Sequence, residues 1–237
     1  MSCEKVDYSY SITMTALDSD VSFSVNCSKF FNKVKVDWGD GNIEKYDLGF
    51  FYKRLEHEYL NESPKIIKIT GFVENLICND NRITNLDVSN NSILRRLECG
   101  NNQLTSLDVN KNTALENLFC DGNQLTSLDV SKNTALENLF CDGNQLTSLD
   151  VSNNTALGTL NCRRNTLTSL DVSNNTLLDG LRCSDNQLTT DALNALFGTL
   201  GMQSTTSHKY INIGGNPGTS TCDRSIASNR GWIVVDY

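Results

Sequence analysis

The chain has 237 residues, of which 20% are charged and 38% are hydrophobic, and its formal net charge is −8 at pH 7. This length accommodates one or two domains with a large core. The acidic balance, with no run of Lys and Arg beside aromatic residues, argues against a nucleic-acid partner. No apolar stretch approaches the roughly 18 residues of a membrane span, so the sequence predicts no membrane segment.

The first residues, from Met1 to Ser11, lack the apolar core of a signal peptide. Two interpretations stay open. In the first, an export signal has been removed and Cys3 is the trace of a lipoprotein cysteine. In the second, Met1 is the native start, and the protein is cytosolic or is delivered by another route, such as a phage particle.

Apolar and polar residues alternate repeatedly between residues 7 and 70, which is typical of half-buried strands. Examples are the stretches from Tyr8 to Met14 and from Val21 to Val25. Asp40-Gly41 is a hairpin turn signal. Five or six short strands of this kind indicate a small β-sandwich.

The sequence WGDG at 38–41, followed by HEY at 57–59, resembles the motif of the PKD-like immunoglobulin fold. The resemblance implies a PKD-like β-sandwich module in residues 1–70. Asp37 and Asp40 are more commonly turn residues than a Ca²⁺ site, because Ca²⁺ needs six or more oxygen ligands. We therefore predict no metal site, and we expect the module to cover the open end of the structure that follows.

A repeat of 21 residues then runs from about Leu76 to Thr190, with the unit L-x-C-x-x-N-x-L-T-x-L-D-V-S-x-N-T-x-L. A fixed period of this size indicates a solenoid. The L-x-C segment predicts a short strand whose leucine and cysteine point inward. The asparagine is expected to turn inward and satisfy backbone groups of the bend. The ladder cysteines are Cys78, Cys99, Cys120, Cys141, Cys162 and Cys183, and the ladder asparagines are Asn81, Asn102, Asn123, Asn144, Asn165 and Asn186.

The ladder cysteines could form disulfides, bind a metal or remain reduced. Coils that stack in register place their Cβ atoms about 4.8 Å apart, whereas a disulfide needs about 3.8 Å. A metal site would need close ligand spacings such as C-x-x-C, and none occurs. We therefore predict reduced, buried thiols that act as small apolar core residues.

The repeat matches the leucine-rich repeat. Its strand cysteine, combined with L-T-x-L-D-V-S-x-N-T, resembles the cysteine-ladder repeats of internalin J and of surface proteins of Bacteroides-type gut bacteria. The resemblance implies a mainly β solenoid of curved 21-residue coils with a parallel concave sheet in residues 71–190. It also implies adhesion or ligand binding at a bacterial cell surface or after secretion, and it favours the removed export signal.

The period breaks after Thr190, and a C-terminal segment of residues 191–237 follows. Apolar residues at helical spacing in 192–200 predict a helix, with Thr190 or Asp191 as N-cap and a glycine as stop. His208 lies in this segment.

Residues 211–216 reproduce L-x-C-x-x-N with isoleucine in place of cysteine. A second short helix at 223–228 precedes Ile233 and Val235, which repeat the strand alternation. We therefore expect eight stacked parallel strands, the last two joined by helix-bearing coils that cap the core.

Residues that flank the inward leucine and cysteine should point into the concave face, where solenoids usually present their binding surface. Two phenylalanines stack there on adjacent coils, beside paired aspartates and with arginines toward the C-terminal end. The candidate binding residues are Glu98, Phe119, Asp121, Phe140, Asp142, Arg163, Arg164 and Arg182. Coil duplication offers another origin for these pairs, because residues 107–127 and 128–148 differ only at Asn110 versus Ser131.

Catalysis finds little support in the sequence. The chain has two histidines, in different segments, and no G-x-S-x-G, H-E-x-x-H, P-loop or G-x-G-x-x-G pattern. We predict no catalytic residues and no cofactor, and a non-enzymatic, monomeric module that recognises a protein or a glycan. The alternatives are a structural or decorating component, for example of a phage particle, and a glycan-acting enzyme.

Overall fold

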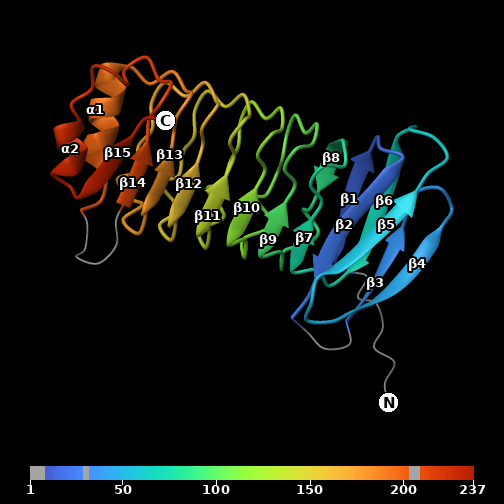
Figure 1. The fold of residues 1–237 in the computed structure, drawn as a ribbon. Helices are drawn as coiled ribbons and strands as arrows, with labels where there is room; N and C mark the ends of the chain where they lie inside the picture. The colour runs from blue at the N-terminus through green and yellow to red at the C-terminus, as the bar shows by residue number, and fades with distance from the viewer. Residues whose placement is uncertain (1–8, 29–31, 203–208) are drawn as a thin grey trace.

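The structure is a computed structural model that describes residues 9–28, 32–202 and 209–237. Cys3 and His208 lie outside the described residues. A row of short parallel strands forms the length of the molecule, with antiparallel strands at its N-terminal end and two helices at its C-terminal end (Figure 1).

Eight parallel strands pair one after another in chain order, which confirms the stacking that the period predicted. Consecutive coils lie in register, so that Leu118 pairs with Leu139 and Phe119 pairs with Phe140. The strands are β7 (Asn75–Ile77), β9 (Arg96–Glu98), β10 (Asn117–Phe119), β11 (Asn138–Phe140), β12 (Thr159–Asn161), β13 (Gly180–Arg182), β14 (Lys209–Asn212) and β15 (Trp232–Val235).

The core is one continuous cluster along this stack. The strand leucines and the ladder cysteines are fully buried, as the alternation predicted. Because no single coil can enclose these side chains, their burial depends on stacked neighbours. A further row of valines from the D-V-S turns is equally buried, and it consists of Val88, Val109, Val130, Val151 and Val172.

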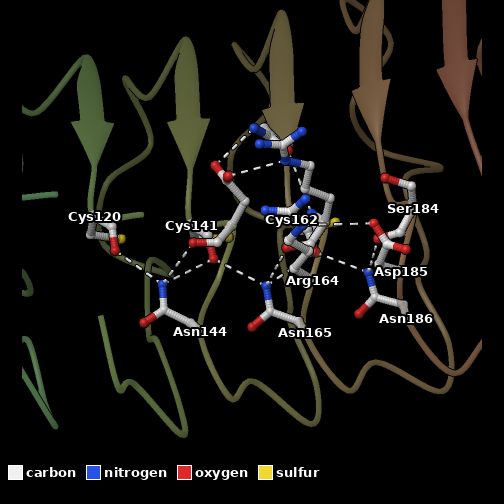
Figure 2. A network of polar contacts seen from close by, with 12 residues as sticks. Cys120, Cys141, Asn144, Cys162, Arg164, Asn165, Ser184, Asp185 and Asn186 are labelled. Atoms are coloured by element: carbon white, nitrogen blue, oxygen red, sulfur yellow. Dashed lines mark hydrogen bonds and ion pairs between the residues drawn. The ribbon is translucent and has the colours of Figure 1, made fainter. Parts of the chain in front are cut away.

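The ladder asparagines join each coil to the one before it by hydrogen bonds (Figure 2). Asn144 Nδ2 donates to the carbonyl oxygens of Cys120 at 3.0 Å and Cys141 at 3.1 Å. Its Oδ1 accepts the backbone N–H of Leu125 at 2.9 Å. The same contacts recur at the neighbouring coils, so a buried amide satisfies backbone groups of two coils at every bend.

A second row of asparagines is buried in the D-V-S-x-N-T turns. Asn154 Nδ2 donates to the carbonyl oxygens of Val130 at 3.0 Å and Asn133 at 2.9 Å, and its side chain is inaccessible. The turn asparagines are Asn91, Asn112, Asn133, Asn154 and Asn175.

The ladder cysteines are unbridged and buried. Burial away from water raises the pKa of the Cys78 and Cys162 thiols to about 12 and raises the pKa of the other four well above the usual value. The six thiols are therefore protonated, apolar core groups.

We expect the ladder thiols to resist alkylation in the folded protein and to react once it unfolds, because neither reagent nor thiolate is available in the core. Mass spectrometry of iodoacetamide-treated protein, with and without urea, measures this difference. Cys222, which is half-buried outside the ladder, is the internal comparison. Rapid native labelling of the ladder would contradict the buried assignment. Unfolded thiols ionise near pH 9 and folded ones do not, so stability should fall as the pH rises from about 9 towards 12.

The N-terminal strands lie in two sheets. β3 (Asn32–Asp37), β4 (Ile43–Leu48), β6 (Lys65–Gly71) and β1 (Ser11–Ala16) form an antiparallel sheet in the order β4-β3-β6-β1. β2 (Asp20–Asn26) and β5 (Lys53–Glu58) join the edge of the parallel sheet, with β2 antiparallel to β7. The parallel sheet thereby grows to ten strands.

The first coil is shared between the two sheets. β8 (Ile83–Asp87) leaves the coil and pairs antiparallel with β1, although its sequence is ordinary repeat sequence. Asn81 has no preceding coil, and its Nδ2 donates at 2.9 Å to the carbonyl oxygen of Ser22 on β2 while its Oδ1 accepts the Ser22 N–H at 2.8 Å. β2 therefore occupies the place of a preceding coil.

Residues of the W-G-D-G and H-E-Y sequences meet in space. Asp40 Oδ2 lies 2.7 Å from His57 Nε2, and the His57 ring stacks on Trp38 with centroids 4.9 Å apart. The Tyr59 hydroxyl donates to the Trp38 carbonyl at 2.7 Å. Hydrogen bonds from Asn42 and His57 lower the pKa of Asp40.

Both carboxylates also bond within the β3–β4 hairpin, where Asp37 Oδ1 accepts the Gly39 N–H at 3.1 Å and Asp40 Oδ1 accepts the Asn42 N–H at 3.0 Å. Among the residues that the structure describes, no cluster of His, Cys, Asp and Glu is placed to hold a metal ion.

Two helices lie at the C-terminal end. α1 (Thr190–Thr199) begins after Thr189, whose Oγ1 accepts the Ala192 N–H at 3.3 Å, so the N-cap lies one residue before those predicted. Gly198 lies within this helix and does not end it. α2 (Arg224–Ser228) has Asp223 as its N-cap.

The last coil is attached to the end of α1. Trp232 Nε1 donates to the carbonyl oxygen of Gly201 at 2.8 Å, and Arg230 Nη1 donates to that of Leu200 at 2.8 Å. Neither helix, nor any other within the described ranges, has the length and apolar character needed to cross a bilayer.

Candidate functional site

The candidate surface is the side of the parallel sheet opposite the buried leucines and cysteines. This side, the outer face, is the surface that the sequence predicted as the concave face. Three outward rows run across its strands. The residue before the inward strand residue supplies Asn75, Arg96, Asn117, Asn138, Thr159, Gly180, Tyr210 and Ile233; the residue after it supplies Ile77, Glu98, Phe119, Phe140, Asn161, Arg182, Asn212 and Val235. Ile233 and Val235, expected to repeat the inward alternation, point outward instead, because Val234 pairs with the buried Ile211. The residue after the cysteine supplies Asp121, Asp142 and Arg163.

The two phenylalanines form the apolar centre of this face. The rings of Phe119 and Phe140 are stacked with centroids 4.9 Å apart and an interplanar angle of 29°. The Arg96 guanidinium lies 4.7 Å from the Phe119 centroid. Both phenylalanines are half-buried and less exposed than the sequence suggested, because each ring is covered on one side by its neighbour.

Arg96 was not among the predicted site residues. Strand alternation offered a signal, because the residue before the inward leucine must point the same way as the residue after it. Arg96 Nε also lies 2.5 Å from Glu98 Oε1, which ties the predicted Glu98 to the phenylalanine pair.

Some of the predicted charged residues form ion pairs. Arg163 Nε lies 3.2 Å from Asp142 Oδ2, and Asn161 Nδ2 donates to Asp142 Oδ1 at 2.8 Å. Arg164 lies 3.9 Å from Asp185, beyond the end of the strand. Asp142 and Arg163 therefore compensate each other's charge and do not stand as separate flanks.

Asp121 and Arg182, two further predicted residues, have no ion-pair partner among the described residues. Asp121 lies over Gly100, where a Cβ would approach its carboxylate to 2.9 Å. Burial, and after it the charge of Asp142, raises the pKa of Asp121. Arg182 is exposed and makes no ion pair within the described part of the chain.

The face also contains a hollow that the sequence did not reveal. It has a volume of about 590 Å³ and lies over β12 to β15, where its lining includes Thr159, Gly180, Arg182, Tyr210 and Tyr237. Gly180 was a visible signal, because it replaces the arginine, asparagine or threonine of earlier coils in the same row.

This architecture resembles solved structures from Listeria monocytogenes. The functional domain of InlJ, described as including a cysteine ladder, has a TM-score of 0.55 and 40% identity, over 64% of this chain and 32% of that chain. The internalin InlF has a TM-score of 0.56 and 18% identity, over 68% of this chain and 46% of that chain. This chain thus spans about a third of the first structure and under half of the second.

No family model matches the chain, and no curated protein matches its sequence. The likeness rests on the fold and on the 40% identity to the InlJ domain. The chain therefore folds as a leucine-rich repeat solenoid similar to internalin-type proteins, one of which also contains a cysteine ladder.

Proposed function

We propose that the chain is a non-enzymatic recognition module that binds a protein partner through the outer face of its parallel sheet, at a bacterial cell surface or after secretion. The observation that carries this proposal is the stacked pair Phe119 and Phe140 in the middle of the outer face. Half-exposed aromatic side chains beside an arginine are typical of interface anchors. The likeness to the InlJ domain supports the same role.

Support for a non-enzymatic role comes from the surroundings of the ladder cysteines and of His57, the side chains that could act as nucleophile or base. The ladder thiols are buried and protonated, so they are poor nucleophiles. His57 is held between Trp38 and Asp40 within the N-terminal region. The outer face therefore has contact groups but no activated nucleophile or base among its described residues.

We propose further that residues 1–70 and 191–237 act as caps of the repeats in 71–190, the former as a PKD-like β-sandwich. The bonds between Asn81 and Ser22 support the N-terminal cap, because β2 meets the polar groups that another coil would meet. The bonds from Trp232 and Arg230 to the end of α1 support the C-terminal cap.

Replacing both Phe119 and Phe140 with alanine should abolish most partner binding and cost about 1–2 kcal/mol of stability. The stability cost reflects the lost ring stacking, whereas an interface anchor commonly contributes about 2 kcal/mol or more to binding. A protein and glycan array would supply the partner, and binding and melting curves would then be compared for both proteins.

The matched control is the double replacement of Gln124 and Gln145 with alanine. These residues are also 21 positions apart and exposed, but they lie outside the three outward rows. Unchanged affinity of the phenylalanine variant for an array partner would place the site elsewhere. Equal loss in both variants would indicate a global effect.

A further inference from the structure

We propose that the hollow over β12 to β15 receives an apolar ring from a protein partner, with a carboxylate beside that ring paired to Arg182. This inference rests on the proposed recognition role of the outer face and names a second contact on it, separate from the phenylalanine pair. The hollow has a volume of about 590 Å³, which is within the usual range for small-ligand sites.

A missing side chain creates the hollow. Along its row, outward side chains stack from coil to coil, as where Asn138 Nδ2 donates to Asn117 Oδ1 at 2.9 Å. Gly180 interrupts the row between Thr159 and Tyr210. Because neighbouring strands lie about 4.8 Å apart, β12 and β14 are separated by about 9.6 Å, which leaves room for one inserted layer.

The backbone of Gly180 does not require glycine. Its φ is not in the left-handed region, and a Cβ there would meet only Thr159 atoms at 3.6 and 3.9 Å, which are ordinary contacts. The absent side chain therefore cannot be explained by strain or crowding, and its consequence is open space beside the Tyr210 side chain.

The walls of the hollow offer aromatic surface on which an apolar ring can stack. Tyr210 and Tyr237 present aromatic surface, with 49% and 92% of their area exposed. Asn212 is already engaged, since its Nδ2 donates to the Tyr237 carbonyl and its Oδ1 accepts the Gly214 N–H. With the Asn212 amide engaged, the two tyrosine rings remain as contact surface, and an apolar ring can stack on them.

The positive charge of Arg182 favours a negatively charged group on the occupant. It follows Gly180 by two residues, so the two share a face and lie about 6.6 Å apart along the strand. The other arginines of this face have carboxylate partners: Arg96 pairs with Glu98, and Arg163 pairs with Asp142. Arg182 lacks such a partner within the described ranges, and an arginine favours the carboxylate of a ligand.

The test uses N-acetyl-Phe-Asp amide as the probe, titrated into the isotope-labelled full chain and followed by amide chemical shifts. We expect millimolar binding, typical of a fragment of this size, with shifts centred on Thr159, Gly180 and Tyr210. Gly180→Leu should weaken binding at least tenfold by filling the hollow. Gly158→Leu is the matched control, because a Cβ there meets only Glu137 O at 3.7 Å and the residue lies outside the hollow.

The role of the Arg182 charge is tested by reversing the charge of the residue and of the probe. Arg182→Glu should weaken the Asp probe about tenfold and strengthen N-acetyl-Phe-Lys amide, which a purely structural role of Arg182 would not produce. Absence of shifts at the hollow, or equal binding to Gly180→Leu, would overturn the proposal. Tighter binding of N-acetylneuraminic acid at the same amides would overturn it in favour of an acidic sugar.

The phenylalanine variant separates this inference from the proposed function. Probe binding should persist when Phe119 and Phe140 are both alanine, because neither residue lines the hollow. Loss of probe binding in that variant, with binding retained in Gly180→Leu, would place the contact at the phenylalanine pair and overturn the hollow alone.

Discussion

Replacing Asn144 with alanine should lower the free energy of unfolding by about 3–5 kcal/mol. Its amide donates to the carbonyls of Cys120 and Cys141 and accepts the N–H of Leu125. Alanine leaves these buried backbone groups without partners, and each unsatisfied group costs about 1–3 kcal/mol. The midpoint of urea unfolding measures the loss.

One repeat supplies two comparisons for this experiment. Asn154→Ala should cost less than Asn144→Ala, because only the two bonds donated to Val130 and Asn133 are lost and its Oδ1 has no partner. Asn153→Ala should be neutral within about 0.5 kcal/mol, because this neighbouring side chain is exposed. Equal effects at all three positions would mean that the buried amides do not stabilise the bends.

Removing residues 191–237 should abolish cooperative unfolding, although the repeats themselves remain intact. The truncation uncovers Leu181 and Cys183 and leaves β13 with an unpaired edge. Exposed apolar surface beside an open strand edge promotes aggregation. Calorimetry, with light scattering as a measure of aggregation, would show the loss.

Deleting residues 128–148 is the matched control for this truncation. The deletion removes one whole coil and keeps both ends, and the neighbouring coils offer the same leucine, cysteine and asparagine to each other. We therefore expect a soluble protein with a single, somewhat lower melting transition, as nearest-neighbour stacking predicts. A truncated chain that melts as sharply as the deletion variant would show that residues 191–237 are not needed as a cap.

The repeat made much of the solenoid predictable. Identical residues at a fixed period meet identical surroundings, so one coil predicts the strand, the buried cysteine and the ladder asparagine of all the others. The turn asparagines were missed because asparagine is ordinary in a turn. Their recurrence at one position in five coils was the available signal.

The pairing of β8 with β1 and the contacts of the outer face were harder to predict for a different reason. β8 has ordinary repeat sequence, and only the presence of β1 beside it makes it a strand of the other sheet. Contacts such as Arg96 with Phe119 or Arg163 with Asp142 depend on which rotamers fit between neighbouring coils. A hollow formed by a missing side chain is visible only when the residues on both sides are placed.

One sheet runs continuously through the N-terminal region and the repeats, so the number of strands fixes the distance along the sheet between its two edges. From β5 to β15 the ten strands are joined by backbone hydrogen bonds at every step. Nine steps of about 4.8 Å separate the two edge strands by about 43 Å along the sheet. A partner that touches both edges must therefore match this length, and each added or lost coil would change the required length by one step.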